Sequence, residues 1–202
     1  MRFLTLLGVL SLVAAVAAPI TARADTTASF HAGGGTLTQL QASAMGWEFS
    51  VTDFVTISSL GIWDSGSDGL SKVHQVGIFR SDTFSLVVGA SIIDGTAAPL
   101  IDGSRFVPVS PVTLTPGVLY YILADDFTAD PFVSGPNSMG FGPEITWVAL
   151  ANSSGISIHD APVFTPGTLG NLGPNFRYTV PTPAAASLLT LGSLMLASRR
   201  RR

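Results

Sequence analysis

The sequence predicts an all-β protein: one antiparallel β-sandwich or jelly-roll-like domain, flanked by an N-terminal signal peptide and a short C-terminal transmembrane sorting helix. Three observations predict this fold class. Between residues 47 and 180, short apolar runs alternate with breaks that contain Gly, Pro or Asp. In the same segment, the 3.6-residue apolar periodicity of a helix never lasts beyond two turns. The chain of 202 residues is long enough for one compact domain. It contains no cysteine, so this domain folds without disulfides or cysteine-bound zinc.

The first 24 residues have the pattern of a secretory signal peptide. Arg2 precedes an uncharged apolar run over residues 3–20, and the small residues Ala22 and Ala24 fit the pocket of signal peptidase. We therefore expect signal peptidase to cut between Ala24 and Asp25. A retained membrane anchor is the alternative, because about 18 apolar residues just suffice to cross a bilayer.

Seven strands are expected in the central segment, where β-branched and aromatic residues alternate with polar ones. In strand register His74, Val76 and Ile78 share one face, which is expected to be core. Residues 25–45 are predicted to be an irregular segment or an edge strand, 127–143 a loop or an irregular edge, and 46–180 the sandwich itself. The expected strands cover residues 47–51, 54–63, 74–79, 84–93, 118–124, 145–150 and 176–180.

Residues 181–202 have the pattern of a membrane-sorting tail. An uncharged apolar segment over residues 184–198 is predicted to be helical, and at 1.5 Å per residue it spans about 22 Å, less than the roughly 30 Å of a bilayer core. The positive charge that follows would stay on the cytoplasmic side, so the folded part would remain outside. The candidate sorting residues lie on both sides of this helix: Val180, Pro181, Thr182 and Pro183 before it, and Arg199, Arg200, Arg201 and Arg202 after it.

The charge of the central segment is strongly negative. Residues 25–180 hold all 13 carboxylates of the chain but only Lys72, Arg80, Arg105 and Arg177, which gives a net charge of −9. This balance disfavours nucleic acid and anionic membrane surfaces as partners, because both need clustered positive charge. Cations are the more plausible small partners.

One segment partly matches a calcium-binding loop. Asp64, Asp68 and Gly69 stand at positions 1, 5 and 6 of such a loop, whereas Gly66 at position 3 and Gln75 at position 12 exclude an EF-hand. Asp64 and Asp68 remain candidates for a looser calcium site completed by backbone carbonyls. The alternative is a Gly/Asp turn between two strands, in which the carboxylates cap backbone amides.

The other polar clusters predict no cofactor or catalytic site. Neighbouring carboxylates on a strand point to opposite faces, so a solvated acidic loop is favoured over a catalytic or metal site for Asp125, Asp126 and Asp130. The histidines lack the spacing of a zinc site, and His74 is expected at the edge of the core. The chain has no GxSxG, P-loop or complete GxGxxG motif.

The tail resembles that of PEP-CTERM proteins of Gram-negative bacteria, in which an exosortase recognises and cuts the C-terminus. The order of Val-Pro-x-Pro, apolar helix and terminal arginines carries the resemblance, although Thr182 stands where the family usually has Glu. The resemblance implies an inner-membrane intermediate held by the helix, an exosortase-like partner, and final release or display at the cell surface. A simple tail anchor is the alternative.

The body resembles an uncharacterised β-sandwich family that is common among PEP-CTERM proteins. The resemblance covers residues 46–124 and implies a fold and a secreted context, but no activity. The matching residues include Gly46-Trp47-Glu48-Phe49-Ser50-Val51, Ile57-Ser58-Ser59-Leu60-Gly61-Ile62-Trp63-Asp64 and His74-Gln75-Val76-Gly77-Ile78-Phe79.

Three functions follow as hypotheses. The first is a non-enzymatic exported protein of the cell surface or extracellular matrix, associated with polysaccharide. The second is a secreted carbohydrate-binding module of jelly-roll type, in which Trp47, Trp63 or Trp147 stacks on a sugar ring. The third is a glycan-active enzyme. A tryptophan exposed beside carboxylates in a groove would favour the second hypothesis, and two facing carboxylates would favour the third.

Overall fold

The computed structural model describes residues 24–39, 43–135, 139–153, 155–166 and 171–181. The expected leader before residue 24, the tail helix at 184–198 and the arginine cluster at 199–202 lie outside these ranges. Within them the chain is all-β. No helix in the described ranges is long and apolar enough to cross a membrane.

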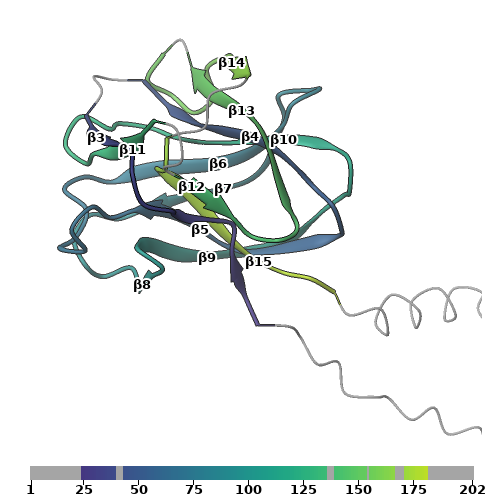
Figure 1. The fold of residues 1–202 in the computed structure, drawn as a ribbon, viewed down its shortest axis with the longest axis horizontal. Coiled ribbons are helices and arrows are strands. Elements are labelled where there is room, and N and C mark those ends of the chain that lie inside the picture. The colour runs from purple at the N-terminus through teal and green to yellow at the C-terminus, as the bar shows by residue number, and fades with distance from the viewer. Residues whose placement is uncertain (1–23, 40–42, 136–138, 154, 167–170, 182–202) are drawn as a thin grey trace, which may run out of the picture.

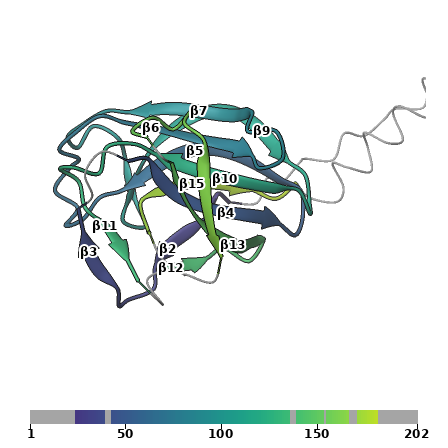
Figure 2. The ribbon, with the colours of Figure 1, turned by 90° about the horizontal axis from the view of Figure 1, so that it is seen from above.

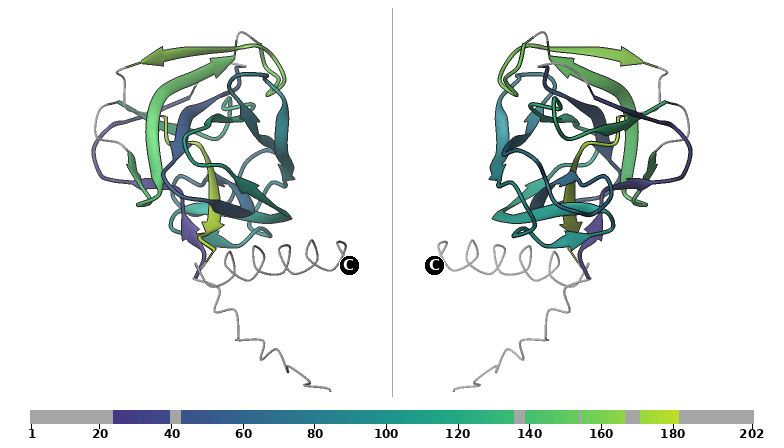
Figure 3. Two further views of the ribbon diagram at one scale, coloured as in Figure 1. Left: turned by 90° about the vertical axis from the view of Figure 1, so that its right-hand side faces the viewer. Right: turned by 90° about the vertical axis from the view of Figure 1, so that its left-hand side faces the viewer.

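Two large antiparallel sheets make up most of the molecule (Figure 1). The five-stranded sheet has the order β1 (Thr26–Thr27), β15 (Pro174–Thr179), β5 (Val55–Trp63), β9 (Ser104–Leu114) and β8 (Leu100–Ile101). The six-stranded sheet has the order β14 (Pro162–Pro166), β13 (Ile145–Ser153), β4 (Met45–Val51), β10 (Leu119–Ala124), β6 (His74–Arg80) and β7 (Leu86–Ile92). In Figures 1 and 3, β13 and β14 lie at the top of the molecule and β8 and β9 toward the bottom.

Two small antiparallel pairs accompany the large sheets. β3 (Thr36–Thr38) pairs with β11 (Phe132–Ser134), and β2 (Ser29–His31) pairs with β12 (Met139–Phe141). Figure 2 shows both pairs on the same side of the large sheets. Residues 127–143, expected to be a loop or an irregular edge, thus include two short strands, because β11 and β12 gain their hydrogen-bond partners from a distant segment of the chain, residues 29–38.

The two large sheets pack face to face as a β-sandwich. Trp47 and Phe49 on β4 contact Phe176 on β15, with ring centroids 5.9 and 5.1 Å apart. Side chains of both sheets form one buried apolar cluster. Gly46 is required on β4, because a Cβ there would lie 1.9 Å from the carbonyl oxygen of Ile122. Burial of these aromatic rings contributes to the stability of the fold.

All seven expected strands are present, with ends that differ by a few residues, and the face of His74, Val76 and Ile78 is fully buried. Three strands of the two large sheets were missed: β8, which has only two residues, and β9 and β14, which both contain prolines. Proline cannot donate to a sheet and is tolerated where a strand edge is open. β8 covers β9 only at Ser104 and Arg105, so the edge is open beside the prolines of β9, and β14 is an edge strand.

Candidate functional site

An open groove of about 780 Å³ lies where the N-terminal strands meet the five-stranded sheet. β1, β2, β12, the end of β5 and the turn between β8 and β9 contribute to it. Its walls combine aromatic rings with two carboxylates. The residues that give it chemical character are Asp25, Phe30, His31, Trp63, Asp102 and Phe141.

Trp63 is the last residue of β5 and presents its half-buried indole to the groove. Its backbone N–H donates to the carbonyl of Gly173 at 2.8 Å, which fixes the backbone end of the side chain. The ring lies beside His31, with centroids 5.9 Å apart. A Cβ on Gly103 would lie 3.4 Å from the indole nitrogen, so the Gly103 backbone packs against the ring edge. The indole is therefore held in place while part of it faces solvent.

Asp102 enters the groove from a two-residue hairpin turn. Asp102 and Gly103 both have positive φ, 49° and 78°, and connect the paired residues Ile101 and Ser104. Asp-Gly is the sequence that such a turn prefers, because both residues tolerate the left-handed conformation. The Thr27 hydroxyl donates to the Asp102 carboxylate at 2.6 Å.

The two carboxylates of the groove differ in their partners. Asp25 forms an ion pair with Arg177 at 3.3 Å and accepts a hydrogen bond from the Ser58 hydroxyl at 3.0 Å. Asp102 has no cationic partner in the described part of the chain. The uncompensated negative charge of the groove therefore lies on Asp102.

β2 supplies the remaining polar and aromatic groups. Phe30 is 44% exposed and its ring covers Gly140, where a Cβ would lie 2.4 Å from the ring. His31 Nε2 lies 3.0 Å from the carbonyl oxygen of Gly34. A carbonyl only accepts, so Nε2 donates this bond, and in the neutral ring Nδ1 is left as an acceptor.

Of the three tryptophans considered for sugar stacking, Trp63 is the one that lines this groove. Trp47 is fully buried in the core and its indole N–H donates to the Pro174 carbonyl at 3.1 Å. Trp147 is half-buried on β13, and its indole N–H is buried with no hydrogen-bond partner in the described residues. We have no physical account of that unpaired N–H.

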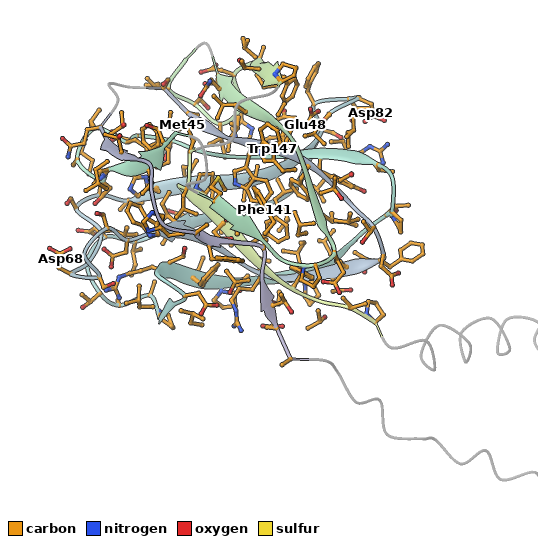
Figure 4. All side chains as sticks on the ribbon, in the orientation of Figure 1. Met45, Glu48, Asp68, Asp82, Phe141 and Trp147 are labelled. Atoms are coloured by element: carbon orange, nitrogen blue, oxygen red, sulfur yellow. The ribbon has the colours of Figure 1, made fainter. Side chains whose placement is uncertain are left out.

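The two calcium candidates occupy different environments. Asp64 is 3% exposed and accepts hydrogen bonds from Arg105 Nε at 2.7 Å and from the Gly69 amide at 3.1 Å. Asp68 is exposed on the turn, at the opposite end of the molecule from Asp82 (Figure 4). The described residues contain no cluster of three or more metal-ligating side chains. Arg105 already supplies the positive charge at Asp64, which favours the turn alternative, and the calcium site stays a prediction.

The expectation of a solvated acidic loop was wrong for Asp130. This carboxylate is buried, and it accepts hydrogen bonds from the Ser71 amide at 2.8 Å and the Lys72 amide at 3.0 Å. His74 is also fully buried, with Nε2 3.0 Å from the Asp130 carboxylate and Nδ1 2.7 Å from the Asp125 carbonyl. The segment that contains Asp130 is thus fastened to the start of β6.

Asp125 and Asp126 diverge, as expected for neighbouring residues. Burial raises the pKa of Asp125, whose carboxylate accepts from the Gln75 amide at 2.6 Å. The hydroxyl of Thr128 and the ammonium of Lys72 lower the pKa of Asp126. The two carboxylates thus have different hydrogen-bond partners, and nothing in these contacts favours a shared acid–base role.

The described parts of the two predicted processing segments lie close together. β1 pairs with β15, which places Thr26 opposite Tyr178. Asp25 precedes β1, and Val180 and Pro181 follow β15. Thr182, Pro183 and the four terminal arginines lie outside the described residues.

The comparisons with known proteins show a distant likeness to a solved structure. No protein-family model matches the chain, and no curated protein matches it. A solved structure, "Structure of infectious bursal disease virus Gx strain", is similar at 10% sequence identity and a TM-score of 0.22. The match covers 89% of this chain and 51% of that one, so this chain spans about half the length of the viral chain.

Trp63 could be predicted from the sequence as a stacking residue, whereas Asp102 and His31 were not predicted to lie beside it. The Asp102-Gly103 dipeptide, directly after Leu100-Ile101, is a hairpin signal that could have located the turn. No local signal could have brought His31 to Trp63, because their proximity depends on how β2 and β5 are placed in the fold.

Proposed function

We propose that this protein is a non-enzymatic, exported component of the cell surface or extracellular matrix that binds an uncharged polysaccharide through the Trp63 groove. The observation that carries the proposal is the half-exposed Trp63 ring beside the Asp102 carboxylate in an open groove. Concave sites that combine aromatic walls with a few polar groups are typical of ligand binding. In this proposal the sandwich is of jelly-roll type, an architecture that often hosts lectin sites.

The chemistry of the groove fits a sugar ring. The apolar C–H face of a pyranose would pack on the indole of Trp63, and its hydroxyls would donate to Asp102 and to Nδ1 of His31. Asp102 lacks a cationic partner in the described chain, so a uronic acid or sulfated sugar would meet like charge there. The proposal therefore names a neutral glycan.

Binding without catalysis is supported by the partners of the two carboxylates. Asp25 is tied to Arg177 and Ser58, and Asp102 to Thr27. Each carboxylate is thus already held by side-chain donors, whereas a glycosidase needs one carboxyl group that donates a proton and another that attacks or activates water.

Export and sorting rest on the sequence patterns at the two ends. The leader before Asp25 is proposed to be cut by signal peptidase, and the tail after Val180 to be handled by an exosortase-like enzyme, as the PEP-CTERM resemblance implies. The pairing of β1 with β15 supports this arrangement, because both cleavage points then lie at one end of the body and leave the groove intact.

A glycan array followed by calorimetric titration of the strongest hit tests the proposal. Trp63→Ala should weaken binding about tenfold or more, because it removes the stacking surface. Asp102→Asn should weaken it less, since Asn keeps the turn and part of the hydrogen bonding. Phe54→Ala is the matched control, because Phe54 is also an exposed aromatic residue, 52% accessible, but lies outside the groove. Unchanged affinity in Trp63→Ala, or a preference for acidic glycans, would contradict the proposal.

A further inference from the structure

A second hollow, of about 520 Å³, lies on the outer face of the six-stranded sheet and is lined by a largely buried glutamate that has no partner among the described residues. Glu48 on β4 is 7% exposed and forms no hydrogen bond or ion pair with any described residue. Its side chain lies on the face of β4 opposite the core residues Trp47 and Phe49. In Figure 4, Glu48 and Asp82 are both at the upper right of the molecule.

A largely buried glutamate without a partner is unusual in a protein. Charged side chains that are buried to this extent are usually paired with an opposite charge. The other buried carboxylates described above, Asp64 and Asp130, follow that rule. Glu48 departs from it, and it does so inside a hollow large enough for a small ligand.

The walls around Glu48 are aromatic and aliphatic. Glu48 pairs with Tyr121 across the sheet, and the Tyr121 ring meets Phe164 edge-on, with centroids 5.5 Å apart. Phe164, Val118 and Leu119 line the hollow itself. Aromatic rings beside a carboxylate form the environment in which proteins hold ammonium groups, through cation–π attraction and charge-assisted hydrogen bonds.

The one cationic residue of the hollow is already engaged. Arg80 donates to both oxygens of Asp82, from Nε at 3.0 Å and from an Nη at 2.6 Å. This hydrogen bonding lowers the pKa of Asp82 to about 2. With Arg80 and Asp82 compensating each other, the hollow retains one excess negative charge, on Glu48.

We propose that this hollow binds a small organic ammonium ion, with its N–H groups donating to Glu48 and its carbon chain packed on Phe164, Val118 and Leu119. A primary ammonium is favoured over a quaternary one, because the Glu48 oxygens lack a hydrogen-bond donor and a quaternary nitrogen has none to offer. An alkyl chain of a few carbons fits the apolar walls. The site is separate from the Trp63 groove, with which it shares no lining residue.

The test is a titration of the purified full-length protein with n-butylammonium, followed by ¹⁵N NMR and calorimetry. Saturable shifts are expected at the amides of Glu48, Leu119 and Phe164. 1-Butanol, which has the same shape without the charge, should bind about tenfold more weakly or worse, and tetramethylammonium should also bind more weakly. Equal affinity for the alcohol, or no saturable binding up to about 50 mM butylammonium, would overturn the proposal.

Variants make the assignment specific to Glu48. Glu48→Gln should weaken butylammonium binding about tenfold or more, because it removes the charge and keeps the shape. Asp94→Asn is the matched control: it also removes one carboxylate, from an exposed position outside the hollow, and should leave the affinity unchanged. Phe164→Leu should weaken binding several-fold through loss of the aromatic face. Wild-type affinity in Glu48→Gln would refute the site even if butylammonium binds elsewhere, and the comparison with 1-butanol keeps the test decisive should that variant fold poorly.

Discussion

Two regions of this sandwich bury carboxylates to nearly the same extent and treat them in opposite ways. In the turn after β5 and the loop after β10, Asp64 and Asp130 are 3% and 6% exposed, and each is surrounded by hydrogen-bond donors. On the outer face of the six-stranded sheet, Glu48 is 7% exposed and has no partner among the described residues. Burial alone therefore does not distinguish a structural carboxylate from a ligand-binding one. The presence or absence of hydrogen-bond donors around the carboxylate makes that distinction.

The partnered carboxylates hold together segments that are distant in the sequence. Arg105, itself buried, binds Asp64 and also donates to the carbonyls of Thr96 at 3.1 Å and Ala98 at 3.0 Å. One ion pair thereby ties the turn after β5 to the segment before β8. In a buried pair with this many additional hydrogen bonds, most of the desolvation cost is offset. Loss of one partner leaves the other charge buried and uncompensated, which destabilises the folded state.

The largest expected effect comes from the loss of Arg105. Arg105→Met keeps the length and apolar stem of the side chain but leaves Asp64 buried without its cation. We expect the free energy of unfolding to fall by about 3–5 kcal/mol, measured by urea denaturation. Arg80→Met is the matched control, because it breaks an Arg–Asp pair with side chains 39% and 57% exposed, and its effect should be far smaller. Equal losses in the two variants would contradict the structural role of the buried pair.

The same unfolding curves test the predicted calcium site at Asp64 and Asp68. A calcium ion that binds only the folded state would raise the wild-type midpoint relative to a chelator control. Magnesium at matched ionic strength separates a specific site from general screening of the acidic body.

A smaller loss is expected at Asp130. Asp130→Asn replaces one oxygen by an NH₂ group, which would face the backbone amides of Ser71 and Lys72 or the ring of His74. We expect a decrease of about 2 kcal/mol in the free energy of unfolding, because the new NH₂ group would then face another N–H donor inside the protein and neither could form a hydrogen bond. Asp126→Asn, in the same loop, breaks an ion pair with side chains about 40% exposed and should cost at most about 1 kcal/mol.

Glu48→Gln tests whether the carboxylate without a partner contributes to stability. Because Glu48 has no partner in the described residues to lose, this substitution should leave the free energy of unfolding unchanged or raise it. A loss as large as that of Asp130→Asn would show that Glu48 has a structural partner.

The strands could be predicted from the sequence because their signal is local. Alternation on β4 and β6 places Trp47, Phe49, Val76 and Ile78 in the core, as their burial confirms. β9 was missed because Pro108 and Pro111 indicate breaks, and what tolerates them is an open strand edge, which is a property of the sheet.

The roles of the polar residues could be predicted much less well. The positive charge at Asp64 comes from Arg105, 41 residues further along the chain, and the donors of Asp130 come from the segment before β6, 58 to 59 residues away. A sequence shows that a carboxylate follows a strand, but its partners depend on which strands become neighbours. From the sequence, Asp64 and Asp68 could be either calcium ligands or capping residues of a turn, and Glu48 was not noticed because it resembles any outward-facing residue of a strand.

The smallest expected effect concerns Tyr121, the cross-strand neighbour of Glu48. Burial raises the pKa of Tyr121 to about 12, and its hydroxyl has no hydrogen-bond partner in the described residues. Between about pH 10 and pH 12 the unfolded chain loses this proton while the folded chain keeps it, so stability falls as the pH rises. The loss due to Tyr121 should be about 1 kcal/mol near pH 11 and absent at pH 7. Urea denaturation at both pH values should show a smaller alkaline loss in Tyr121→Phe than in wild type, with nearly equal stability at pH 7. An identical alkaline loss in the two proteins would show that the Tyr121 hydroxyl titrates as it does in water.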